Sequence, residues 1–238
     1  MIYVILGLVG LVAGLLSGAV GFGGGMIILP VITYFYGIEV AVPVATIAQL
    51  MSNLGKISFT FKQINWKYAG LFLITALPLT TLGTIGFSIA PKVLMTRLLG
   101  VFLIVFAILK IAGKMNLPKG KGTVLIGGGV TGLINGMMGI SGPLSSAVFL
   151  TVGLSPVAYI ATEATAAAAM HIVKTLMYNK LALLDTPGLL HGLYIGAAMI
   201  IGNYIAIHFL KKVDNKKFYQ TFVAIIMIAA SLWLIISA

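Results

Sequence analysis

GLLSGAVGFGGG, at residues 14–25, is a glycine-rich break inside a long uncharged run of this chain. A second stretch, GLINGMMGISGP at residues 132–143, has glycines at the same spacing 118 residues further along. The same offset relates Lys56 to Lys174, and half of the chain is close to that length. The pattern therefore indicates a duplication, with residues 1–118 as one membrane repeat and residues 119–238 as the other.

The composition places the whole chain in a lipid bilayer. Of its 238 residues 60% are hydrophobic and 8% are charged, whereas soluble domains have about 25% charged residues. Four acidic residues and no cysteine argue against a carboxylate-rich active site or a thiolate metal site. We expect no metal, no cofactor and no catalytic residues. The net charge of +11 fits loops that face anionic lipid, not nucleic acid.

Two uncharged runs are too long for a single membrane span. They cover residues 1–38 and 122–162, while about 20 residues suffice to cross the hydrocarbon core. Each run must therefore fold back at its glycines. In each half we expect a glycine-broken helix pair and then three transmembrane helices: 3–20 with 26–36, then 40–61, 67–90 and 92–112; and 123–138 with 143–153, then 156–178, 187–210 and 214–236.

The charges between these segments predict how the two halves are oriented. If each glycine-broken pair enters and leaves on one side, ten basic residues collect on one face and three on the other. A parallel arrangement divides the same residues seven to six. Only the first arrangement satisfies the positive-inside rule. We therefore predict an all-α, multi-pass bundle of two inverted repeats in the cell (inner) membrane, with the lysine-rich linker in the cytoplasm, both termini outside and the first helix retained.

Two lysines fall inside expected helices, at equivalent positions of the repeats. Lys56 follows Asn53 by three residues, and Lys174 follows His171 by three, so each pair shares a helical face. One interpretation is that both lysines snorkel along their stems to the membrane interface. The other is that they face a cavity and attract an anion, because an ionisable residue inside a membrane needs such surroundings.

The glycine breaks supply a second attraction for an anion. A helix that restarts after a break exposes free N–H groups and its positive dipole end. Close packing of helices is the alternative use of such glycines. We expect Glu163 and His171 to be candidates for proton coupling. The candidate substrate-binding residues are Gly21, Phe22, Gly23, Gly24, Gly25, Thr46, Gln49, Asn53, Lys56, Gly139, Ser141, Gly142, Thr162, His171 and Lys174.

These motifs resemble the TauE/SafE family, also described as sulfite exporters or TSUP transporters. GLLSGAVGFGGGMIILP at residues 14–30 looks like the family's first signature, and residues 132–143 look like the second. The resemblance implies an integral membrane transporter for sulfite, sulfonates or other small sulfur-containing anions. The second break departs from the first, because Pro143 has no N–H and the two breaks cannot donate alike.

The leading hypothesis is a secondary transporter, by expectation an exporter, of such an anion. No nucleotide-binding motif of the form GxxxxGK[ST] occurs in the chain. The alternative is an intramembrane enzyme that uses His171 and Glu163 on a lipid-borne substrate. We expect a small anion and the lipid bilayer as partners, no nucleic acid, and leave a homodimer open.

Overall fold

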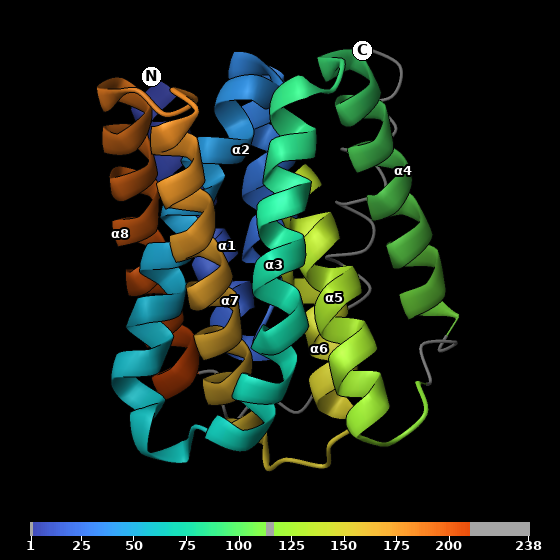
Figure 1. Cartoon of the computed structure of the whole chain (residues 1–238). Coiled ribbons are helices and arrows are strands. Elements are labelled where there is room, and N and C mark those ends of the chain that lie inside the picture. The colour runs from blue at the N-terminus through green and yellow to red at the C-terminus, as the bar shows by residue number, and fades with distance from the viewer. Residues whose placement is uncertain (1, 113–116, 210–238) are drawn as a thin grey trace.

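The computed structural model describes residues 2–112 and 117–209 as a bundle of helices, with no strand in those ranges (Figure 1). In chain order the helices are α1 (Ile2–Val20), α2 (Gly24–Thr60), the 3₁₀ turn η1 (Phe61–Gln63), α3 (Trp66–Ile89), α4 (Lys92–Ile111), α5 (Lys121–Met138), α6 (Gly142–Leu150), α7 (Pro156–Lys180) and α8 (Thr186–Phe209). The all-α fold is confirmed. The expected helix at 214–236 lies outside the described residues.

The helix boundaries follow from glycines and capping residues. Inside α2, Gly37 leaves the helical conformation (φ +76°, ψ 163°), so this element consists of two helices that meet where the sequence predicted a division. Asn65 caps α3 by accepting a hydrogen bond from the N–H of Tyr68 (3.2 Å). Ser155 caps α7 in the same way, and Pro156 follows at the start of the helix, where its missing N–H has no cost.

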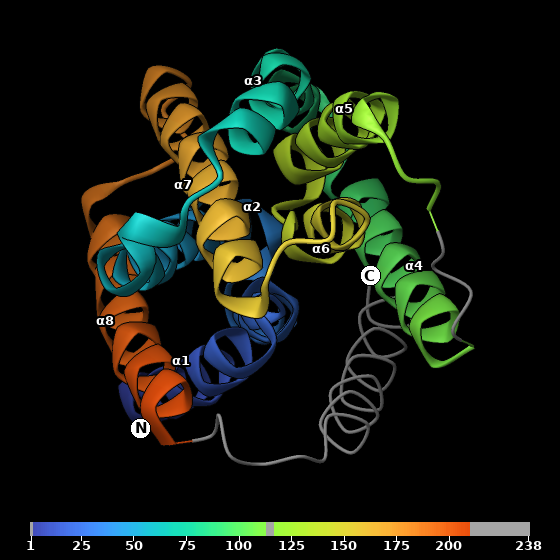
Figure 2. The same cartoon turned by 90° about the horizontal axis from the view of Figure 1, so that it is seen from below.

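Five described helices, α1 to α4 and α8, are long and apolar enough to cross a membrane. Helix α7 is not among them although it has 25 residues. Figure 2 shows α7 in the interior of the bundle, between α2 and α3 and beside α6. Four of its polar side chains, those of Thr162, Glu163, His171 and Lys174, are buried against protein. A multi-pass membrane protein is therefore confirmed, with α7 shielded by its neighbours.

The helix pairs with the most extensive contacts are α1 with α8 and α3 with α5. Equivalent glycines of the repeated stretch make both contacts. Gly14 lies against the backbone of Met199, and Gly132 lies against the backbone of Ala76; a Cβ at either glycine would overlap that backbone. Glycine permits this approach because no side chain intervenes. Gly14 and Gly132, upstream of the breaks, therefore serve close helix packing.

Candidate functional site

Both glycine breaks end a helix in the same way. The N–H of Gly21 donates to the carbonyl of Ser17, and the N–H of Gly139 donates to that of Asn135, each at 2.8 Å. Gly21 (φ +92°) and Gly139 (φ +78°) adopt left-handed conformations that favour glycine. We call residues 21–25 the first break and residues 139–142 the second break. The sequence repeat is therefore matched by a repeated local structure.

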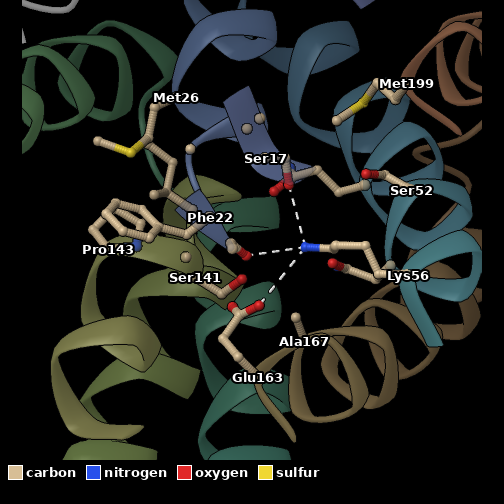
Figure 3. A pocket seen from close by; sticks show the side chains of 18 residues that line it. Ser17, Phe22, Met26, Ser52, Lys56, Ser141, Pro143, Glu163, Ala167 and Met199 are labelled. Carbon is tan, nitrogen blue, oxygen red and sulfur yellow. Dashed lines mark hydrogen bonds and ion pairs between the residues drawn. The ribbon is translucent and has the colours of Figure 1, made fainter. Parts of the chain in front are cut away.

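The two breaks meet inside the bundle. A Cβ added to Gly142 would lie 3.1 Å from the Cβ of Phe22 and 3.5 Å from the backbone nitrogen of Gly23. Between the breaks lies a narrow pocket with a cavity volume of about 20 Å³ (Figure 3). Its lining comes from both halves of the chain and consists of Ser17, Gly21, Phe22, Gly23, Gly24, Gly25, Met26, Gln49, Ser52, Asn53, Lys56, Ile140, Ser141, Gly142, Pro143, Glu163, Ala167 and Met199.

Lys56 reaches across this pocket from α2 and is 1% exposed. Its ammonium donates to the hydroxyl of Ser17 (3.2 Å) and to the carbonyl of Gly21 (3.1 Å). Nζ also lies 3.8 Å from Oε2 of Glu163, which comes from α7. The snorkelling interpretation is wrong for Lys56, because its side chain points into the bundle.

Glu163 is buried on the opposite wall of the pocket. Its Oε1 accepts a hydrogen bond from the hydroxyl of Ser145 on α6 (2.8 Å). Its Oε2 faces Lys56 and has no hydrogen-bond donor among the described residues. The pocket therefore contains one positive and one negative side chain, which belong to different halves of the chain.

Gln49 and Ser52 connect α2 to its surroundings at the pocket. The side-chain amide of Gln49 donates to the carbonyl of Gly139 in the second break (3.0 Å) and fills the place that a Cβ of Gly25 would need. The amide of Asn203 on α8 donates to the hydroxyl of Ser52 (2.8 Å). Helix α2 is thus tied to the second break and to α8.

Lys174 lies in a second buried cluster outside the pocket. It is fully buried, which also excludes snorkelling, and its ammonium donates to the carbonyl of Asn135 (2.8 Å). The ring of Tyr178 lies 5.5 Å from Nζ. Both ring nitrogens of His171 and the side-chain amide of Asn135 have no hydrogen-bond partner among the described residues. No acidic side chain in the described part of the chain forms an ion pair with Lys174.

Most of the predicted substrate-binding residues line the pocket, together with Glu163. Five lie outside it: Thr46, Gly139, Thr162, His171 and Lys174. Thr46 and Thr162 donate to backbone carbonyls of their own helices, at Val42 (2.8 Å) and Ala158 (2.6 Å). The sequence also placed Ser52 on a polar face with Gln49 and Asn53, but it missed two hydroxyl groups at the site, those of Ser17 and Ser145. The equivalence of Ser17 with Asn135 at the offset of 118 was a usable signal for the first of them.

Fold and site together define a polytopic helical membrane protein with a polar pocket between two helix breaks. A family model described as "Sulfite exporter TauE/SafE" matches residues 6–234, and the chain belongs to this family. The resemblance to this family is thereby confirmed. Membership supports a membrane anion transporter. No curated protein and no solved structure matches the chain at a significant level.

Proposed function

We propose that this protein is a secondary transporter that exports a small sulfur-containing anion, such as sulfite or an organosulfonate, across the cell membrane. The observation that supports this most is the pocket between the two breaks, which combines a buried lysine with the starts of two helices. An anion in this pocket is attracted by Lys56 and by backbone N–H groups at the same time.

The helix starts supply hydrogen-bond donors without side chains in the way. Helix α2 begins at Gly24 and helix α6 begins at Gly142, and the first N–H groups of a helix have no partner inside that helix. Their dipoles add a partial positive charge at the same place. Pro143 removes one donor from α6, so the first break supplies more of the hydrogen bonds.

An inside-negative membrane potential favours export of an anion. It contributes roughly 2.3 kcal/mol per elementary charge for each 100 mV. Export therefore needs no nucleotide hydrolysis, and the sequence contains no Walker motif for it.

We further propose that residues 1–118 and 119–238 form two inverted repeats that alternate access around the pocket. Two observations support this. In Figure 1, α1 begins at the end of the bundle marked N and α5 begins at the opposite end. The packing partners are also exchanged, because α1 lies along α8 while α5 lies along α3. Repeats related by a two-fold axis in the membrane plane produce such an exchange.

Flux across a sealed membrane tests the transport function. Purified protein in proteoliposomes is expected to move radiolabelled sulfite or sulfonate down its gradient, without chemical change of the anion. Lys56→Met is expected to reduce this flux at least tenfold, whereas Lys62→Met, at an exposed position beyond the same helix, is expected to leave it at the wild-type level. Absence of flux in the wild-type protein would reject transport.

The alternative of an intramembrane enzyme makes a different prediction for the same sample. It requires a converted product from protein in detergent, where no gradient exists. His171 and Glu163 would have to act on one substrate, but only Glu163 lines the pocket. Product analysis beside the flux measurement separates the two functions.

A further inference from the structure

The ion pair between Lys56 and Glu163 joins the two halves of the chain at the proposed substrate site. Lys56 belongs to α2 and Glu163 to α7, and they are the two ionisable residues in the pocket lining (Figure 3). Both are at most 2% exposed. An anion that enters the pocket therefore meets this ion pair, which affects how the anion binds.

The ammonium of Lys56 makes two hydrogen bonds and one longer ion-pair contact. It has three N–H groups, and three oxygens surround it, from Ser17, Gly21 and Glu163. The carboxylate contact is the longest of the three, at 3.8 Å. An incoming anion therefore gains direct contact with Lys56 by replacing Glu163.

The surroundings hold Glu163 in place by one oxygen only. Ser145 donates to Oε1, while Oε2 has no hydrogen-bond donor among the described residues. On the same helix, Tyr159 lies one turn earlier and His171 two turns later. From the other elements packed against α7, Lys56 of α2 is the charged group that faces the carboxylate, and α6 contributes the neutral Ser145.

Charge balance then connects the anion to a proton. With Glu163 ionised, the pair is neutral, and an added anion would leave the buried pocket with excess negative charge. Uncompensated charge in a low-dielectric interior costs several kcal/mol. Binding of one proton by Glu163 removes one unit of this negative charge and also frees Lys56 for the anion.

We propose that Glu163 competes with the transported anion for Lys56, so that one proton travels with each anion. This proposal rests on the transport function above. On the loading side, a proton from water forms an O–H bond at Oε2, the anion takes the place of the carboxylate beside Lys56, and Lys56 stays an ammonium. On the other side the anion leaves, and Glu163 returns the proton to water and pairs with Lys56 again. Of the two proton-coupling candidates, Glu163 is preferred to His171 because it lines the pocket.

The coupling is compatible with export. A divalent anion that moves with one proton carries a net single negative charge, which an inside-negative potential still drives outward. A monovalent anion moves without net charge, and then its own gradient and the proton gradient decide the direction. The charge of the substrate thus decides whether the membrane potential contributes to the driving force.

The test follows proton and anion together in proteoliposomes of the full chain. Thiosulfate and ethanesulfonate serve as probes, because neither takes up a proton near neutral pH. A pH-sensitive dye is enclosed, and a potassium ionophore fixes the membrane potential. We expect one proton per anion, and anion binding that weakens by up to about tenfold for each unit of rising pH, as uptake of one proton requires. Anion flux without proton flux would overturn the coupling and leave the transport function standing, whereas absence of anion flux would reject the transport function itself.

Two variants locate the proton. Glu163→Gln is expected to bind thiosulfate with an affinity that does not change with pH and to move it without protons. Glu39→Gln, at an exposed position of α2, is the matched control and is expected to keep the wild-type stoichiometry. Unaltered proton coupling in Glu163→Gln would overturn the assignment. If that variant fails to fold, the wild-type proton measurement still decides whether coupling exists.

Discussion

Lys56 and Lys174 occupy equivalent positions of the two halves but have different partners. Lys56 is paired with the carboxylate of Glu163, while Lys174 donates to a backbone carbonyl. Removal of one member of a buried ion pair leaves the other without compensation, at a cost of about 3–5 kcal/mol. We therefore expect Lys56→Met to lower the thermal unfolding midpoint clearly. Lys174→Met is expected to leave the midpoint unchanged or raise it, because it removes a buried cation that has no acidic partner among the described residues. Unfolding in detergent measures both.

A double variant checks the origin of the effect. Glu163→Gln added to Lys56→Met removes the orphaned carboxylate and is expected to recover most of the lost stability. If the double variant is as unstable as Lys56→Met alone, the loss comes from packing around the lysine stem and not from charge. Comparison of the single and double variants, a double-mutant cycle, measures the free energy of interaction between two residues in contact.

The sequence predicted individual site residues unevenly. Lys56 and Gly142 were identifiable because a charge inside an apolar helix and a repeated glycine are local signals. The partner of Lys56 was not identifiable from the repeat, because the first half has Ala45 and Ile47, neither acidic, where the equivalent of Glu163 would lie. An ion pair between residues more than 100 positions apart depends on tertiary packing.

At the scale of elements, Gly142 and Gly37 show two different roles of glycine in this chain. A Cβ at Gly142, the start of α6, would lie 3.1 Å from that of Phe22, where the two breaks meet. A Cβ at Gly37, in the bend of α2, would meet nothing within 4 Å, but its backbone conformation (φ +76°, ψ 163°) is open almost only to glycine. Gly142 allows the two breaks to lie in contact, and Gly37 allows the chain to change direction within α2.

This difference predicts opposite phenotypes for two alanine variants. Gly142→Ala is expected to reduce anion flux severalfold with little change in unfolding midpoint, since it crowds the pocket without backbone strain. Gly37→Ala is expected to cost about 1–3 kcal/mol of stability while the folded fraction still binds the anion. Thermal unfolding and thiosulfate binding, measured on the same samples, test both expectations. Reduced stability with normal flux in Gly142→Ala would show that the breaks are not at the substrate site.

Helix positions were predictable because charges, prolines and glycines divide the apolar sequence into segments of membrane length. The described helices agree with those expectations to within a few residues, and even the bend at Gly37 falls between two expected segments. What the pattern did not predict is that α7 lies in the interior. Its polar residues contribute to a pocket wall and a buried cluster, and only the packing of α2, α3 and α6 around α7 determines that.

At the scale of the whole molecule, the inverted repeat stays a prediction that the exchanged packing of α1 and α5 supports. It matters for function because two similar halves of opposite orientation have two nearly equivalent arrangements, one open to each side. The Lys56–Glu163 pair connects these halves at the pocket. A change from one arrangement to the other would therefore act directly on the Lys56–Glu163 pair.

Cysteine labelling tests the orientation directly, because the chain has no native cysteine. Lys119→Cys, in the exposed linker before α5, is expected to react with a membrane-impermeant maleimide only after the cells are broken. Lys180→Cys, exposed at the end of α7, is expected to react in intact cells, as is a cysteine at position 238. The reason is the positive-inside rule, which assigns the lysine-rich linker to the cytoplasm. Each variant must first retain anion flux. Reaction of Lys119→Cys in intact cells would reverse the orientation, and labelling of positions 119 and 180 from one side would reject the inverted arrangement.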